Sequence, residues 1–329
     1  MRIDVHGHVA VKEVLRSSAH PEPWRFEAPR DANGWQTLRN DRMTNGPIPH
    51  EAVEWSGIVE ALDATKVDLM AVSPVPFLLY YYLDDRSALE TSRAQNDAIA
   101  AGVAAYPRRF VGLGTVPLQN VDLAVKELER VVCDLRMPGI EVGSNVEGTY
   151  LGHERLRPFW EAVQALDALV FVHPMDPLGA DKLRDYYLIN LIGNPVDTTR
   201  CIADVVFSGL LEEFPRLKLC FAHAGGTVPY IGGRWEHGYH VRKEPKVKIT
   251  RPPSEYLKLL YFDTITHSSS ALEFLVKTVG ADHVVVGSDY PFDMGPAQPV
   301  SFVEEAQMIS AEDKRKIISE TPARLLKLS

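Results

Sequence analysis

Two histidines near the start of the chain, His6 and His8, have the types and spacing of metal ligands. They follow the short apolar run Arg2–Val5 and stand two residues apart. Because side chains along a strand alternate between its two faces, residues at this spacing point in the same direction. A pair of neutral imidazoles on one face indicates a transition-metal site without identifying the metal. The alternative interpretation is a surface loop that holds no ligand.

Three further residues stand just after apolar runs. His173 follows Ala-Leu-Val-Phe-Val, His223 follows Lys-Leu-Cys-Phe-Ala, and Asp289 follows Val-Val-Val-Gly-Ser. Taken singly, a histidine there is more often a hydrogen-bonded core residue, and an aspartate before Tyr-Pro is more often a turn or a helix cap. All three, with the first pair, fall at the carboxyl ends of predicted strands, where barrel enzymes build their active sites.

The five residues divide into four metal ligands and one free imidazole. Three histidines and a carboxylate, namely His6, His8, His173 and Asp289, leave room for water on a divalent ion, as in a catalytic metal site. This assignment leaves His223 unligated. Because imidazole ionises near neutral pH, such a residue is suited to act as a general base or acid.

The elements that must position these residues alternate between strands and helices. Short runs rich in Val, Ile, Leu and Phe predict eight buried parallel strands, at Arg2–Val5, Val67–Val72, Phe110–Val116, Gly139–Val142, Ala168–Val172, Lys218–Ala222, Leu259–Asp263 and His283–Gly287. Amphipathic stretches between them predict helices, at Ile58–Lys66, Leu89–Ala105, Val121–Arg136, Glu154–Asp167, Thr199–Gly209 and Ala271–Val279. This rhythm predicts an α/β fold, a (β/α)8 TIM barrel that spans residues 1–329 as a single domain.

One segment is too long to be a plain connection between a strand and its helix. Residues 9–55 follow the first predicted strand and are dense in Pro, Arg and Asn. Insertions of this length usually have a function, so we expect a lid or an interface element.

Composition excludes several classes of partner. The 329 residues include 35 Lys and Arg against 44 Asp and Glu, a net charge of −9, which argues against nucleic acid or an anionic membrane as partner. The charged run Glu127–Arg130 is expected to be a solvated helix face.

The cysteines and the absence of targeting patterns bear on location. Three cysteines without a CxxC motif indicate neither a disulfide framework nor a thiolate zinc cage, and no signal peptide or membrane span is predicted. We therefore expect a cytoplasmic location.

Five motifs together resemble the decarboxylases of the amidohydrolase superfamily. The motifs are Asp4-Val-His-Gly-His8, Val172-His-Pro-Met-Asp176, Phe221-Ala-His-Ala-Gly-Gly226, Arg251-Pro-Pro-Ser-Glu-Tyr256 and Gly287-Ser-Asp-Tyr-Pro-Phe292. Within this superfamily they are most similar to the 2-amino-3-carboxymuconate-6-semialdehyde decarboxylases. The resemblance implies a barrel of the metal-dependent amidohydrolase type that holds one Zn²⁺ per chain, with Mn²⁺ as an alternative.

The resemblance also implies roles for individual residues. The four predicted ligands match the zinc ligands of these decarboxylases, while His223 matches the histidine that activates water, with Asp289 beside it. Strand four carries Glu141 where binuclear members usually have a modified lysine, which implies a single metal.

Substrate contacts are implied at five positions. Arg234 matches an arginine that reaches the substrate from the neighbouring subunit of a homodimer. Tyr187 falls where the family has an aromatic gate residue, and Phe292 matches a pocket phenylalanine. Met175 replaces an aromatic residue beside the metal histidine, and Arg42 is the counterpart of a second substrate arginine.

The resulting hypothesis is non-oxidative decarboxylation of an unsaturated or aromatic carboxylic acid. In one route, His223 takes a proton from water and the hydroxide adds to the double bond next to the departing carboxylate. In the other route, which resemblance to resorcylate and carboxyvanillate decarboxylases implies, an acid protonates the ring carbon first. Two rival hypotheses stay open: a lactone or amide hydrolase with the same site, and a binding protein with a purely structural metal.

Overall fold

Eight parallel strands form the centre of the molecule, which is known from a computed structural model describing residues 1–32, 34–40, 42, 44–48 and 54–328. The strands are β1 (Ile3–Val9), β4 (Leu69–Pro74), β5 (Phe110–Gly114), β6 (Gly139–Gly143), β9 (Leu169–His173), β10 (Lys218–Phe221), β11 (Tyr261–Asp263) and β12 (Val284–Val285). They are neighbours in chain order. The last strand reaches the first through the bridges Asp4–Val286 and Gly7–Tyr290, which close the sheet into a barrel.

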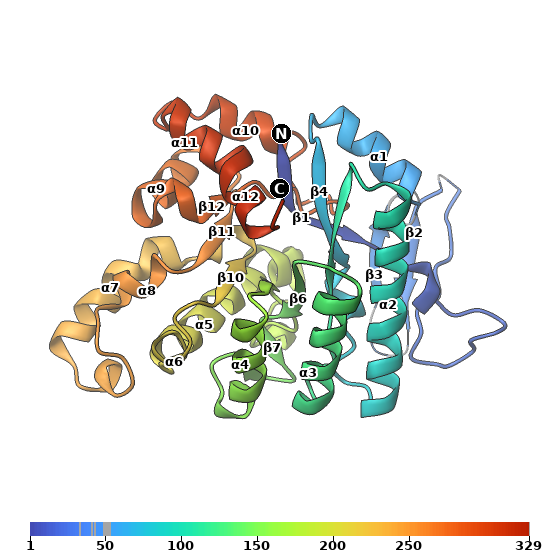
Figure 1. Ribbon diagram of the computed structural model, residues 1–329, viewed down its shortest axis with the longest axis horizontal. Coiled ribbons are helices and arrows are strands. Elements are labelled where there is room, and N and C mark those ends of the chain that lie inside the picture. The colour runs from blue at the N-terminus through green and yellow to red at the C-terminus, as the bar shows by residue number, and fades with distance from the viewer. Residues whose placement is uncertain (33, 41, 43, 49–53, 329) are drawn as a thin grey trace.

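Helices surround the barrel, as Figure 1 shows. They are α1 (Trp55–Ala64), α2 (Asp85–Ala105), α3 (Val121–Glu129), α4 (Arg157–Ala165), α5 (Asn194–Phe207), α6 (Leu210–Glu213), α7 (Val228–Val241), α8 (Pro253–Leu257), α9 (Ser269–Val279), α10 (Pro299–Glu305), α11 (Ala311–Arg315) and α12 (Thr321–Leu325). Helix α4 illustrates the packing, because Phe159, Trp160 and Val163 lie on one face and are buried. All five residues of β9 are also buried, as expected for a strand covered on both sides.

The predicted barrel is confirmed, and each of the eight predicted strands overlaps one observed strand. The main difference is at β1, which continues to Val9 instead of ending at Val5. It does so because the pairing with β4 continues through His8 and Ser73, after a register shift between Asp4 and Gly7. His6 and His8 therefore lie within a strand.

A second difference concerns the charged run at the end of α3. Glu127 is fully buried, so the run is not a solvated helix face. Its carboxylate accepts hydrogen bonds from Asn96 and Arg130. These partners offset the cost of burying the charge.

The insertion contains a small antiparallel hairpin, β2 (Gln36–Arg39) and β3 (Thr44–Ile48). Phe26, Leu38 and Ile48 are buried and join the main hydrophobic core, so the described part of the insertion packs on the barrel. It lies beside α2 in Figure 1. Positions 33, 41, 43 and 49–53 of the predicted segment 9–55 lie outside the described residues.

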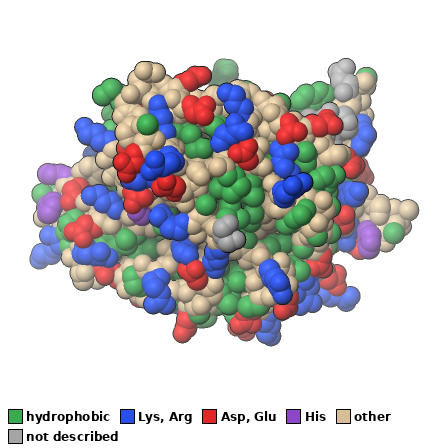
Figure 2. Space-filling view, turned by 45° about the horizontal axis from the view of Figure 1, so that its top comes forward, with side chains coloured by type: hydrophobic (Ala, Val, Ile, Leu, Met, Phe, Trp, Pro, Cys, Tyr) green, Lys and Arg blue, Asp and Glu red, His purple; other side chains and the backbone are tan. Residues whose placement is uncertain are grey.

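The molecular surface is mixed in charge. Figure 2 shows Lys and Arg side chains interspersed with Asp and Glu side chains over one face, without a broad area of one sign. Within the described ranges, no helix has the length and apolar character needed to cross a bilayer.

Candidate functional site

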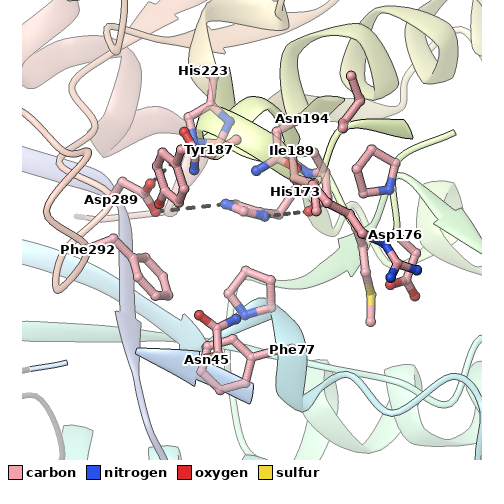
Figure 3. A pocket seen from close by; sticks show the side chains of 17 residues that line it. Asn45, Phe77, His173, Asp176, Tyr187, Ile189, Asn194, His223, Asp289 and Phe292 are labelled. Carbon is pink, nitrogen blue, oxygen red and sulfur yellow. Dashed lines mark hydrogen bonds and ion pairs between the residues drawn. The ribbon is translucent and has the colours of Figure 1, made fainter. Parts of the chain in front are cut away.

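The structure brings four predicted ligands together at the carboxyl end of the barrel. One ligand atom from each of His6, His8, His173 and Asp289 lies within 4.8 Å of the others, and all four residues are buried. Asp289 Oδ1 is 3.2 Å from His6 Nε2, 3.1 Å from His8 Nε2 and 3.8 Å from His173 Nε2. Strands β1 and β9 and the loop after β12 supply these side chains (Figure 3 shows His173 and Asp289).

The hydrogen bonds of the three imidazoles show which nitrogens face the centre. The Nδ1 atoms lie next to acceptors: His6 to Asp263 Oδ2 at 2.7 Å, His8 to the Pro74 carbonyl at 3.2 Å, and His173 to the Pro174 carbonyl at 2.9 Å. A neutral imidazole that donates through Nδ1 presents a lone pair at Nε2.

With all three imidazoles neutral, three lone pairs and a carboxylate oxygen converge on one point. His6 Nε2 and His8 Nε2 are 3.1 Å apart, and the buried His173 Nε2 has no hydrogen-bond partner among the residues that the structure describes. Such a group of acceptors needs a cation, and a His₃Asp set is the donor chemistry of a divalent transition ion. The residues present fit the single metal that the sequence predicts.

The charges of the site are consistent with this interpretation. Burial lowers the pKa of His173 to about 3, so this imidazole is neutral near pH 7. Burial acts to raise the pKa of Asp289, but the surrounding histidines, chiefly His6, hold it well below its usual range. Burial lowers the pKa of His6, yet Asp289 and Asp263 outweigh this effect and raise it to about 10. The two carboxylates thus attract a positive charge, which a metal ion supplies in place of a proton.

Asp263, at the end of β11, is a functional residue that the sequence analysis misses. Its carboxylate contacts His6 Nδ1 and accepts hydrogen bonds from the backbone N–H groups of His223 and Ala224, both at 2.8 Å. It therefore orients one ligand and fixes the loop that carries the free imidazole. The available signal was its place at the end of the run Leu259–Asp263, the same kind of position from which His173, His223 and Asp289 are predicted.

Glu141 supports the second ligand. It is fully buried on β6, and its Oε2 lies 3.4 Å from His8 Nδ1 and accepts a 2.5 Å hydrogen bond from Ser73 Oγ. These contacts are on the side of the His8 ring away from the ligand atom Nε2. Glu141 thus lies behind His8 and outside the four-residue group.

His223 stands beside the group without belonging to it. Its Nε2 is 3.3 Å from Asp289 Oδ2, whereas the contacts of His6, His8 and His173 with this carboxylate are to Oδ1. Both His223 and Ala224 have left-handed backbones, with φ of 53° and 55°. Residues with a Cβ rarely adopt this conformation, and here the carboxylate of Asp263 holds it in place.

A cavity of about 340 Å³ opens onto His173, His223 and Asp289. Met175, Tyr187 and Phe292, three of the predicted substrate contacts, line it. The Phe292 ring lies 5.6 Å from the ring of His8, which places an aromatic wall beside the metal ligands.

The two predicted arginines lie outside this lining. Arg42 is half exposed; its guanidinium lies 3.5 Å from Glu147 and over the Tyr82 ring. Arg234 is exposed on α7. The structure adds lining residues that the sequence analysis does not single out, including Asn45, Asn194 and Arg184. In Figure 3, Asn45 and Phe77 lie across the cavity from His223.

Together, the barrel and the buried His₃Asp group define a metal-dependent enzyme of the amidohydrolase type. The amidohydrolase family matches residues 3–328, so the chain belongs to this family, as the resemblance predicted.

Several similar proteins are named decarboxylases. The chain is 35% identical over 331 residues to the 2-amino-3-carboxymuconate-6-semialdehyde decarboxylase of Dictyostelium discoideum, covering 97% of this chain and 89% of that protein. Among solved structures, it is similar to a 2,6-dihydroxybenzoate decarboxylase in complex with 2,6-dihydroxybenzoate, with a TM-score of 0.84, 26% identity and 99% of both chains covered. It is also similar to a dihydroxybenzoic acid decarboxylase of Polaromonas sp. JS666 with bound manganese and 2-nitroresorcinol, with a TM-score of 0.83, 26% identity and 99% and 97% covered.

Proposed function

We propose that the protein is a metal-dependent carboxy-lyase that removes carbon dioxide, without oxidation, from an unsaturated or aromatic carboxylic acid. The observation that carries this proposal is the convergence of the four ligand atoms beside a free imidazole at the base of an aromatic-lined cavity. The substrate we favour is 2-amino-3-carboxymuconate-6-semialdehyde or a close analogue, because the 35% identical relative bears that name. A hydroxybenzoate of the resorcylate or carboxyvanillate type is the alternative, which the dihydroxybenzoate decarboxylase supports.

His6, His8, His173 and Asp289 would hold one ion per chain. We propose zinc, with manganese as the alternative because a related structure contains it. When bound, a divalent ion of this kind acts as a Lewis acid that polarises oxygen and makes water more acidic.

The protein's own residues move protons and position the substrate. His223 takes a proton from water and later delivers one to the carbon that loses its carboxylate. Asp289 serves this step as well as ligation, because its Oδ2 holds His223 Nε2 at 3.3 Å while Oδ1 faces the ligands. Phe292 and Tyr187 wall the cavity, so they keep bulk water away from the reacting carbon.

The insertion supplies part of the same wall, so we propose that it acts as a lid. Asn45 on β3 lines the cavity. Burial raises the pKa of Asp176, a residue that lines the cavity, and the positive charge of Arg42 acts in the opposite direction. Arg42 is therefore near Asp176. We therefore propose that Arg42 meets the acid at the rim of the cavity.

We propose a homodimer in which Arg234 reaches the neighbouring active site. The same helix exposes Tyr230 and Val241, 86% and 60% accessible, and Tyr230 borders a second cavity of about 540 Å³ that also contacts His223. Mixing an Arg234→Ala protein with a His223→Ala protein tests this. Recovery of activity in the hybrid supports a shared site, and no recovery contradicts it.

We also propose a cytoplasmic location. The three cysteines are free, which supports a reducing compartment.

The reaction class is tested by following carbon dioxide release from a panel of muconate and hydroxybenzoate acids, with ring opening of lactones measured in parallel. We expect metal-loaded protein to release carbon dioxide, chelated protein to be inactive, and added metal to restore activity. Lactone opening without carbon dioxide release would favour the hydrolase. Cooperative loss of the fold on chelation, with no turnover of any compound, would favour a structural metal.

A further inference from the structure

The cavity contains a positive charge with no assigned role. Among the described residues that line it, Arg184 is the single Lys or Arg. Its charged neighbours in the lining are Asp176 and Asp289, both acidic. Asp289 is committed to the ligand group, so Arg184 is the cationic side chain that this lining itself offers to an anionic group, whereas Arg42 and Arg234, proposed above to reach the substrate, lie outside the lining.

Arg184 is also unpaired within the part of the chain that the structure describes. Its guanidinium is exposed and forms no ion pair there, although Asp185 adjoins it in sequence and Asp181 lies three positions before it. Arg42, by contrast, already contacts Glu147 and the Tyr82 ring. A guanidinium left without a partner at a cavity wall retains its full capacity to bind a carboxylate through two parallel hydrogen bonds.

The backbone turns sharply just after Arg184. Tyr186 and Tyr187 both have left-handed conformations, with φ of 55° and 61°, which cost non-glycine residues about 1–2 kcal/mol each. Arg184 and Tyr187, on either side of this turn and three positions apart, both line the cavity.

We propose that Arg184 binds a second carboxylate of the substrate, distinct from the carboxylate that leaves, and so selects dicarboxylic over monocarboxylic acids. The inference rests on the proposed function and sharpens it. An acid with one carboxylate needs only the metal centre, whereas an acid with two brings a second negative charge near Asp176. Arg184 neutralises that charge, which favours the muconate class over simple hydroxybenzoates.

The test measures binding of two unreactive probes to the metal-loaded protein by calorimetry: isophthalate, with two carboxylates, and benzoate, with one. We expect the native protein to prefer isophthalate. Arg184→Gln should lower the affinity for isophthalate by about 10- to 100-fold, because a hydrogen-bonded charge pair is lost, and should leave the affinity for benzoate nearly unchanged. Arg184→Lys should recover part of the preference, since it keeps the charge but loses the planar fork.

Lys182→Gln is the matched control, because this residue belongs to the same segment, is exposed and is absent from the cavity lining. It should leave both affinities unchanged. Equal binding of the two probes by the native protein, or an unchanged preference in Arg184→Gln, would overturn the proposal. Probe binding does not require turnover, so failure of this inference is separate from failure to release carbon dioxide.

Discussion

The two ends of the barrel treat charge in opposite ways. At the amino ends of the strands, opposite charges form pairs at the surface: Arg2 Nη2 lies 2.6 Å from Asp68 Oδ1, and Lys218 Nζ lies 2.7 Å from Asp167 Oδ1. At the carboxyl ends, imidazole lone pairs and the Asp289 carboxylate converge without any Lys or Arg among the four ligands. The charges at the amino end already have partners, whereas the ligand group at the carboxyl end needs a cation. The difference separates charges that form surface ion pairs from charges that are suited to metal binding and catalysis.

The largest expected effect comes from the free imidazole at the carboxyl end. His223→Asn should lower the rate of carbon dioxide release by about 10²- to 10⁴-fold, the usual contribution of a general acid or base. Metal content, measured by elemental analysis, should stay near that of the native protein, because His223 is outside the ligand group.

His267→Asn is the control for this substitution, since His267 borders the second cavity and is absent from the described lining of the first. It should leave the rate nearly unchanged. Loss of the metal together with His223 would show that this imidazole is a ligand, and would contradict the division of roles.

Asp263→Asn should have an intermediate effect, because it acts through other residues. An asparagine cannot accept all of the hydrogen bonds from His6 and the 223–224 backbone, and its NH₂ group would face His6 Nδ1 in one orientation. We expect metal affinity to fall by about 10- to 100-fold, as for other residues that orient a ligand. Titration with metal should restore much of the activity, and a protein that binds metal with native affinity would exclude this positioning role.

The smallest effect should come from the amino end. Asp68→Asn removes a half-exposed pair and should cost at most about 1 kcal/mol of stability, with unchanged catalysis. The hydrogen bond from Arg2 lowers the pKa of Asp68 in the folded state. The pair therefore contributes its full stability to the folded protein above the unfolded-state pKa of Asp68, and this stability is lost as pH falls through the folded-state pKa.

The melting temperatures of the native protein and of Asp68→Asn should therefore differ slightly at neutral pH and become equal in acid. The difference should also shrink at high salt, because the pair is partly exposed. A large loss of activity in Asp68→Asn would break the distinction between the two ends of the barrel.

Simple rules of strand geometry predict much of the fold and the ligand group. Alternation along a strand relates His6 to His8, and the shared carboxyl edge of a barrel relates both to His173 and Asp289. The same rules also place Asp263 at this edge, at the end of the run Leu259–Asp263, but they do not reveal that it supports a ligand instead of being one. Its partner His6 is 257 residues away in sequence, so only the closed barrel reveals the contact.

Burial is harder to predict for charged residues. Glu127 belongs to a charged run that indicates a solvated face, yet it is fully buried. Its partner Asn96 comes from the preceding helix, and no local pattern reveals that the two will meet. The role of Arg184 is hidden in the same way, because the cavity forms only when distant segments come together.

The closure of the barrel between its first and last strands also bears on how the protein is made. His8 and Asp289, which lie in contact, are separated by 281 residues. A chain emerging from the ribosome exposes His6 and His8 well before Asp289, because 281 residues separate His8 from that carboxylate. The four-residue group therefore cannot be completed until translation has passed residue 289, and a product terminated before that residue would carry an incomplete group.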